Sequence, residues 1–330
     1  MKRIVWMLSI AGFALLLGAT IFALTWLRRP LGPALALEVP PEAQARQAAE
    51  AQVAPQAQKT CGNSGVMRLV VIGRASPSDH ARYGADAVRL ALLDFDAPAA
   101  AILALPNELW VSSPALAEQG FEQTSLNMVY QTAWENAKGN PDHVRAQKAT
   151  QALAQTIVAN FEFVPDHYVT VEEAPFIEYI DALGGVEVNL AQAVDGSAEG
   201  YGSYPQGVQV LTGLRALNLT RLMHPSGQPE ADIWGSLGRQ DAVLQGLRDT
   251  ALKLGNVAKI PELVKAMRKA ITTDLSVDQA LDLACMVQEV GSEAVLLVVG
   301  PELVRIDEQG RMIPDVEGIK ALIAEMGGGS

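Results

Sequence analysis

The clearest structural pattern in the sequence is the run Asp166-His167-Tyr168-Val169-Thr170-Val171, continued by residues 174–183, the pair Gly184-Gly185 and Val186-Glu187-Val188-Asn189-Leu190. Residues 167–171 are mostly β-branched or aromatic, which is typical of a strand. Residues 174–183 predict a helix, and the two glycines end it because glycine adopts the left-handed conformation of a helix cap at little cost. Residues 186–190 alternate apolar and polar side chains, which predicts a second strand. The run therefore predicts strand, helix, glycine turn and strand, with the glycines as scaffold.

Further elements flank this run on both sides. Strands are predicted at residues 66–72, 86–93, 100–105 and 294–299, and helices at residues 125–134, 143–161, 212–220, 239–254, 261–271, 276–290 and 316–325. The turn residues Asp94-Phe95-Asp96-Ala97-Pro98 predict a hairpin between the second and third strands. This mixture predicts an α/β fold, of the mixed α+β kind, with a central mixed β-sheet flanked by helices.

Length and charge limit the classes of function. The chain has 330 residues and a formal net charge of -12. That length allows one large domain or two small ones. An acidic protein without a basic cluster repels phosphate backbones, so we expect no nucleic-acid partner.

The N-terminus carries a long apolar segment. Ile4 to Leu27 contains no charged residue and, at about 24 residues, is long enough to span a bilayer. We expect residues 1–29 to form a single-pass transmembrane helix that holds an extracytoplasmic domain on the cell membrane. A cleaved signal peptide is the alternative, with Ala34-Leu35-Ala36 as its cleavage site.

The remaining chain divides by composition. Residues 30–62 are rich in proline and alanine, which predicts a partly extended linker between membrane and domain. Residues 63–255 form the main domain, and residues 256–330 a C-terminal α/β extension packed on it. The two cysteines, Cys61 and Cys285, either form a disulfide or are two independent buried thiols.

Five motifs, in order along residues 66–254, resemble the LytR-CpsA-Psr family of cell-envelope proteins. The first four are Gly84-Ala85-Asp86-Ala87-Val88, Ala104-Leu105-Pro106-Asn107-Glu108, Ser125-Leu126-Asn127 with Tyr130, and the run at 166–188. The fifth extends from Gly207 to Gln240 and contains Gly213-Leu214-Arg215-Ala216-Leu217, Thr220-Arg221 and Arg239-Gln240. The resemblance implies a glycopolymer transferase that moves a polyprenyl-pyrophosphate-linked glycan, with one phosphate, to peptidoglycan or another cell-wall acceptor. It also implies Mg²⁺, which neutralises charge on the leaving group, and arginines, which match phosphate oxygens in pairs.

The resemblance also implies site residues. It gives catalytic roles to Arg221, Arg239 and Gln240, substrate contacts to the positions of Asn107, Glu108 and Met223, and metal binding to Asp86.

The sequence departs from the family at several of these positions. The family's first metal-binding aspartate aligns with Ala75, and three arginine positions fall at Asn107, Met223 and either Ser236 or Gly235. The loop after the first strand offers Asp79 as a second carboxylate and Arg74, His80 and Arg82 as further cations, whereas Arg89 and Arg215 are expected to face solvent. His224, in a loop with proline and glycine, is expected to be solvated.

Three functions stay open. One is a Mg²⁺-dependent phosphotransferase with a rebuilt site. The second is a non-catalytic module that binds polyprenyl lipid or glycan, favoured by the lost arginines. The third is an extracytoplasmic scaffold protein.

Overall fold

The structure is a computed structural model that describes residues 28–45, 47, 61–75, 84–227, 231–251, 253 and 271–327. Within these ranges, no helix is both long and apolar enough to cross a membrane. The predicted transmembrane segment, up to residue 27, lies outside the described residues. So do Asp79, His80, Arg82 and all but the last residue of the helix predicted at 261–271.

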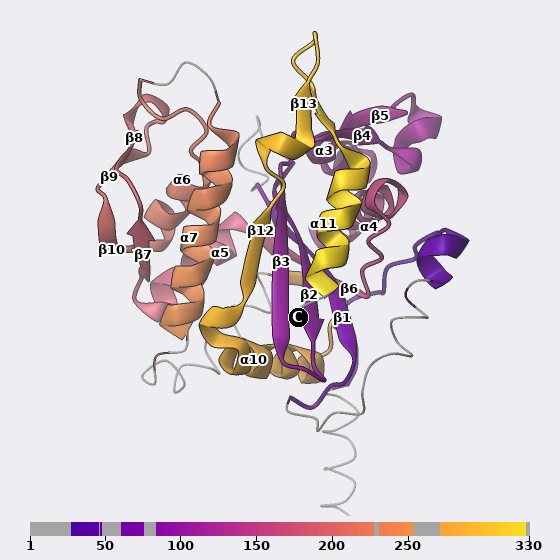
Figure 1. The fold of residues 1–330 in the computed structure, drawn as a ribbon, viewed down its shortest axis with the longest axis horizontal. Coiled ribbons are helices and arrows are strands. Elements are labelled where there is room, and N and C mark those ends of the chain that lie inside the picture. The colour runs from indigo at the N-terminus through magenta and orange to yellow at the C-terminus, as the bar shows by residue number, and fades with distance from the viewer. Residues whose placement is uncertain are drawn as a thin grey trace, which may run out of the picture.

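A mixed sheet forms the centre of the molecule, and in the described chain it has six strands in the order β11-β6-β1-β2-β3-β12 (Figure 1). The strands are β1 (Val66–Arg74), β2 (Ala85–Asp94), β3 (Ala99–Leu105), β6 (His167–Glu172), β11 (Ile271–Thr273) and β12 (Val295–Val298). β1, β2 and β3 form an antiparallel meander, while β6 runs parallel to β1 and β12 parallel to β3. The central mixed sheet and the hairpin between β2 and β3 are confirmed.

The two faces of the sheet carry separate apolar cores because side chains alternate along each strand. On β1, Val70 and Ile72 point into one core, and Met67 and Leu69 into the other. Helices α3 (Leu126–Asn136), α4 (Asp142–Phe161) and α11 (Val316–Gly327) cover the first face, and α10 (Val277–Val290) covers the second (Figure 1).

A smaller layer stands beside the sheet (Figure 1). It pairs β7 (Val186–Leu190) with β10 (Gly207–Leu211) and packs them with α5 (Glu173–Leu183), α6 (Gly213–Arg221) and α7 (Ile233–Ala251). The predicted glycine turn joins α5 to β7. Gly185 has φ +107°, and an added Cβ would lie 2.8 Å from Val210 Cγ1, so the turn needs glycine here.

Short paired strands complete the described fold. They are β4 (Trp110–Ser112) with β5 (Gln123–Ser125), β8 (Val194–Gly196) with β9 (Gly202–Tyr204), and β13 (Val304–Ile306) with β14 (Met312–Pro314).

Helix α7 begins earlier than residue 239, where the sequence pattern placed its start. The Asp232 side chain accepts the backbone N–H of Gly235 at 3.1 Å, as a helix-capping aspartate does. Two glycines, Gly235 and Gly238, weaken the helical pattern in the first two turns, and the cap offsets them.

The C-terminal segment is part of the central sheet. In the described chain β11 and β12 form the two edges of this sheet, so part of the C-terminal α/β segment predicted at residues 256–330 adds strands to it. Ile271, expected at the end of a helix, is the first residue of β11, where it pairs with Val171.

The first part of the predicted linker is extended and docked on the domain. We call residues 28–39 the strap. Leu35 and Leu37 pack against the core under α4, and Pro30 forms a β-bridge with Ser276. Apolar side chains every second residue give this extended segment one face to bury.

A disulfide joins Cys61 to Cys285 of α10, with a Cα–Cα distance of 5.6 Å. Of the two sequence-based alternatives for the cysteines, the structure has the pair.

Candidate active site

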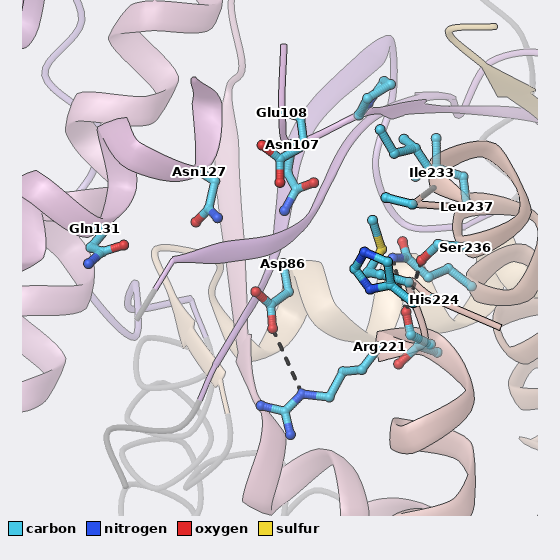
Figure 2. A pocket seen from close by; sticks show the side chains of 15 residues that line it. Asp86, Asn107, Glu108, Asn127, Gln131, Arg221, His224, Ile233, Ser236 and Leu237 are labelled. Atoms are coloured by element: carbon cyan, nitrogen blue, oxygen red, sulfur yellow. Dashed lines mark hydrogen bonds and ion pairs between the residues drawn. The ribbon is translucent and has the colours of Figure 1, made fainter. Parts of the chain in front are cut away.

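A cavity of about 310 Å³ opens where the smaller layer meets one end of the central sheet. Asp86 is the second residue of β2, and Pro106, Asn107 and Glu108 directly follow β3. β2 and β3 are antiparallel, with Val88 opposite Leu105. The start of β2 and the end of β3 therefore lie at the same end of the sheet. The opposite wall comes from the end of α6, the following loop and the first turns of α7, and it includes Thr220, Arg221, Met223, His224, Ser236 and Gln240. Figure 2 shows Arg221, His224 and Ser236 on this wall.

The cavity therefore gathers most of the residues that the sequence singled out. Its lining includes Asp86, Asn107, Glu108, Asn127, Arg221, Met223 and Gln240. Residues from four separate motifs meet here, although up to 154 positions separate Asp86 from Gln240 (240 − 86).

Arg221 lies between two carboxylates. Its Nη2 is 2.5 Å from Glu173 Oε1, and its Nε is 3.9 Å from Asp86 Oδ2. Glu173 is buried in the first turn of α5, whereas Asp86 is partly exposed to the cavity. Figure 2 shows Asp86 and Arg221 on opposite walls, joined by the longer contact. Arg221 is thus fixed by Glu173 and presents its charge beside Asp86.

Asn107 and Glu108 form the rim on the side of the sheet. Asn107 Nδ2 donates to the Ala85 carbonyl at 3.0 Å, and the Asn107 carbonyl accepts the N–H of Asn127. The amide of Asn107 thus ties the β3 end to the β2 start, where the family places an arginine. Desolvation by the surrounding protein raises the pKa of Glu108, which makes this carboxylate a better proton acceptor.

Arg89 is buried, so the expectation that it faces solvent is wrong. Its Nη1 lies 2.5 Å from Asp241 Oδ1, and its Nη2 donates to Gln240 Oε1 at 3.2 Å. Burial lowers the pKa of Arg89, while the charge of Asp241 opposes that change. Arg89 therefore does not enter the cavity, but it orients Gln240, which does.

Arg239 is placed apart from the cavity lining. It is 5% exposed, its Nη1 lies 2.8 Å from Asp232 Oδ2, and its Nη2 donates to the Leu222 carbonyl. These partners lie before α7 and after α6. The guanidinium thus holds the α6–α7 loop, whereas the resemblance implied a catalytic role.

Arg74, Ala75 and Arg215 also lie outside the described lining of the cavity. Arg74 is 2% exposed, pairs with Glu172 at 2.5 Å and lies over the Trp134 ring. Ala75 is buried at the end of β1. Arg215 stacks on Tyr204 and donates to the Ser203 carbonyl at 2.8 Å, on the far side of α6.

His224 and Glu199 form a pair that the sequence analysis missed. His224 Nδ1 lies 2.7 Å from Glu199 Oε1, and the same carboxylate accepts the backbone N–H groups of Met223 and His224 at 3.2 and 3.1 Å. Partial desolvation opposes these hydrogen bonds, but together they lower the pKa of Glu199. With Nδ1 donating to Glu199, Nε2 keeps its lone pair. The two residues are 25 positions apart with no local motif, so only the folded chain brings them together.

The described residues fit a Mg²⁺ site of one kind only. No group of three or more His, Cys, Asp and Glu side chains forms a cage anywhere in the described ranges. Magnesium in phosphate-binding sites commonly uses one or two carboxylates, with phosphate oxygens and water completing the shell. Asp86, partly exposed in the cavity, suits that mode.

Comparisons with known proteins match the chain to a family. The LytR_cpsA_psr family model matches residues 42–312. The TagU polyisoprenyl-teichoic acid–peptidoglycan teichoic acid transferase of Oceanobacillus iheyensis is 29% identical over 181 residues, which are 54% of this chain and 49% of the relative. TagU of Bacillus subtilis is 31% identical over 152 residues, 44% of this chain and 47% of the relative. The chain thus spans about half the length of these relatives.

A solved structure shares the fold. The crystal structure of B. subtilis TagV superposes with a TM-score of 0.60 at 18% identity, covering 81% of this chain and 99% of TagV. The family match extends over most of the chain, from the strap's end to β14. The chain therefore belongs to the LytR_cpsA_psr family.

Proposed function

We propose that this protein is a cell-envelope glycopolymer transferase. Its substrate would be a glycan linked to a polyprenyl lipid through pyrophosphate, and its acceptor peptidoglycan or another wall polymer. The relatives named above are teichoic acid transferases of this type. The observation that carries the proposal is the cavity, in which Asp86, Arg221 and Gln240 meet as one site.

Arg221 is the group that would hold the pyrophosphate. Its guanidinium is oriented by the buried Glu173, so little side-chain freedom is lost when a phosphate binds. A substrate phosphate would compete with the longer contact to Asp86, at 3.9 Å, rather than with the contact to Glu173 at 2.5 Å. Gln240, held by Arg89, supplies a neutral amide to the same wall.

His224 is the candidate base. The acceptor hydroxyl oxygen would attack the phosphorus that bears the glycan, and its proton would pass to His224 Nε2. The bond from that phosphorus to the bridging oxygen breaks. The glycan then leaves on the acceptor as a phosphodiester, and polyprenyl monophosphate takes the electron pair. Glu199, 2.7 Å from Nδ1, holds the imidazole in the tautomer that leaves Nε2 free to accept the proton.

Asp86 would hold Mg²⁺ if the reaction uses the ion. Bound there, the metal would neutralise the charge that develops on the leaving phosphate. Membrane attachment through residues 1–29 belongs to the same proposal, because a polyprenyl substrate is itself held in a membrane. The Cys61–Cys285 disulfide supports an oxidising, extracytoplasmic location.

The test compares two arginines of one helix. Full-length protein is incubated with a synthetic polyprenyl-pyrophosphate disaccharide, Mg²⁺ and a peptidoglycan fragment, and release of polyprenyl phosphate is measured. Loss of a charge-assisted contact costs about 1.5–3 kcal/mol, so Arg221→Met should slow turnover about 10- to 150-fold. Arg215→Met, on the other face of α6, should stay within about twofold of wild type.

Two variants test His224 and Glu199. His224→Gln removes the base and should slow turnover about 10²- to 10⁴-fold, while Glu199→Gln should slow it less, because the amide oxygen can still accept the Nδ1–H. Turnover within about twofold of wild type in both variants would remove His224 from the mechanism.

A second function is favoured by one observation. Among the described lining residues, Arg221 is the only arginine or lysine, and it already contacts Glu173 and Asp86. A dianionic pyrophosphate would then be weakly neutralised, as in a non-catalytic module that binds lipid-linked glycan. Saturable binding of the substrate without release of polyprenyl phosphate, with or without Mg²⁺, would establish this alternative.

A further inference from the structure

The strap fixes the start of the described chain to one end of the sheet. Pro30 bridges to Ser276, the residue before α10, and the Leu31 N–H donates to the Leu275 carbonyl at 3.0 Å. Arg28 lies 3.7 Å from Asp278 in the first turn of α10. The residues that directly follow the apolar segment Ile4–Leu27 therefore lie on the N-terminus of α10.

Two glutamines of α4 hold the strap further along. Gln151 accepts the N–H of Ala36 at 2.8 Å and donates to its carbonyl, and Gln155 does the same with Glu38 at 2.8 and 2.9 Å. Residues four apart on a helix are spaced about 6 Å, close to the spacing of residues two apart on an extended chain. The two amides thus pair with the strap as a neighbouring strand would.

Close packing leaves the strap little freedom. An added Cβ on Gly32 would lie 2.6 Å from the Thr273 carbonyl oxygen, and Tyr168 Oη donates to the Pro33 carbonyl at 3.4 Å. Because the chain docks from residue 28 onward, no flexible spacer separates the apolar segment from the domain.

Helix α10 presents a second apolar stripe, away from the sheet. Its inner side packs Leu283, Met286 and Val290 into the core. Leu281 is 51% exposed and Val287 40% exposed, and Ala284 between them is also exposed. Positions 281, 284 and 287 recur every three residues, so they lie along one outward side of the helix.

We propose that this outward stripe of α10 rests on the membrane that holds the N-terminal segment. The inference rests on the membrane attachment given under Proposed function. The occupant is the bilayer because Arg28, which directly follows the apolar segment, lies 3.7 Å from Asp278 in the first turn of α10. The acidic residues Asp278 and Glu289 border the stripe, so it contacts the acyl boundary rather than recognising anionic headgroups.

The same geometry places the cavity at the far end of the sheet. The end of the sheet near α10 is marked by His167 at the start of β6, which lies near Leu275 and pairs with Leu69 on β1. The end near the cavity is marked by Ala87, next to Asp86, which pairs with Gly73 on β1. Leu69 and Gly73 are four residues apart (73 − 69), or about 13 Å along the strand. A domain resting on α10 turns the cavity towards a wall acceptor.

The test measures depth in the membrane with spin labels on the full chain in lipid nanodiscs. The two native cysteines are paired, so single cysteines accept the label at Leu281→Cys, Ile306→Cys and Leu15→Cys. Ile306, on β13, is 55% exposed and lies at the opposite end of the molecule from α10 (Figure 1). We expect the label at 281 to be reached by oxygen and shielded from a nickel chelate, at roughly 5–10 Å depth. The label at 306 should be open to the chelate.

Each other outcome overturns the proposal. If the label at 15 is in lipid but that at 281 is as open to the chelate as that at 306, the anchor holds and α10 does not touch the bilayer. If all three are open, the anchoring itself fails. A label at 281 shielded from both reagents would mean that protein, not lipid, covers the stripe.

Discussion

The ion pair between Arg89 and Asp241 gives the sharpest test of how the site is supported. Arg89 Nη1 and Asp241 Oδ1 lie 2.5 Å apart, and Arg89 is 5% exposed. Gln240 Oε1 accepts a hydrogen bond from Nη2 of the same guanidinium. Burial lowers the pKa of Arg89 and raises that of Asp241, so each charged form depends on the other. Asp241→Leu leaves the guanidinium buried without its carboxylate, which should cost about 3–5 kcal/mol of unfolding free energy.

The double variant Arg89→Met with Asp241→Leu removes both charges and keeps apolar volume. Replacing a buried ion pair in this way is often neutral or stabilising. We therefore expect the double variant to lie within about 1 kcal/mol of wild type and to be more stable than Asp241→Leu alone. The pair then contributes specificity, by orienting Gln240, more than stability.

Urea denaturation followed by circular dichroism measures these differences. The midpoints should differ at constant slope, because the same surface is exposed on unfolding. A loss of less than about 1 kcal/mol in Asp241→Leu would mean that Arg89 reaches solvent, as expected from the sequence. A double variant as unstable as the single one would show that packing, not charge burial, sets the cost. Turnover should fall in the double variant, because Gln240 loses its partner.

Three further predictions test other parts of the structure. Replacing Cys61 and Cys285 with serine opens a loop of 224 residues and should lower the unfolding free energy by about 5 kcal/mol, measured by denaturation with and without reductant. A hydrogen bond to the buried Asp274 raises the pKa of His167. The stabilisation that protonated His167 gives the folded state is therefore complete below about pH 6.5, and it is lost as the pH rises through the folded-state pKa of His167. His167→Gln should flatten the pH profile of the melting temperature in that range, and an unchanged profile would exclude His167 as its source. Gln151→Ala with Gln155→Ala should cost about 1–3 kcal/mol and speed amide exchange in the strap alone, whereas exchange spread over the whole domain would contradict local docking.

Local patterns predicted the elements well because each depends on neighbouring residues. The alternation in residues 186–190 and the glycines after α5 define β7 and its turn without reference to the rest of the chain. Family motifs then indicated that Asp86, Asn107, Arg221 and Gln240 would share a site, and one cavity brings them together.

The side chains' environments were not predictable in the same way. Arg89 lies in a strand, and the sequence pattern does not distinguish an exposed from a buried position there; Asp241 of α7 buries it. Arg239 contacts the α6–α7 loop because Asp232, which caps α7, pairs with it. The His224–Glu199 pair joins two loops whose separation in sequence carries no periodic signal.

The sequence by itself determined the long central strands, most of the long helices, the family and the residue types available for chemistry, because these follow from local periodicity and short motifs. Only the tertiary structure decided that the strap is docked, that the C-terminal segment supplies both edges of the sheet, and that Arg221 is shared between Glu173 and Asp86. The physical reason is that burial and charge pairing depend on contacts between residues far apart in the chain, and local patterns do not specify those contacts.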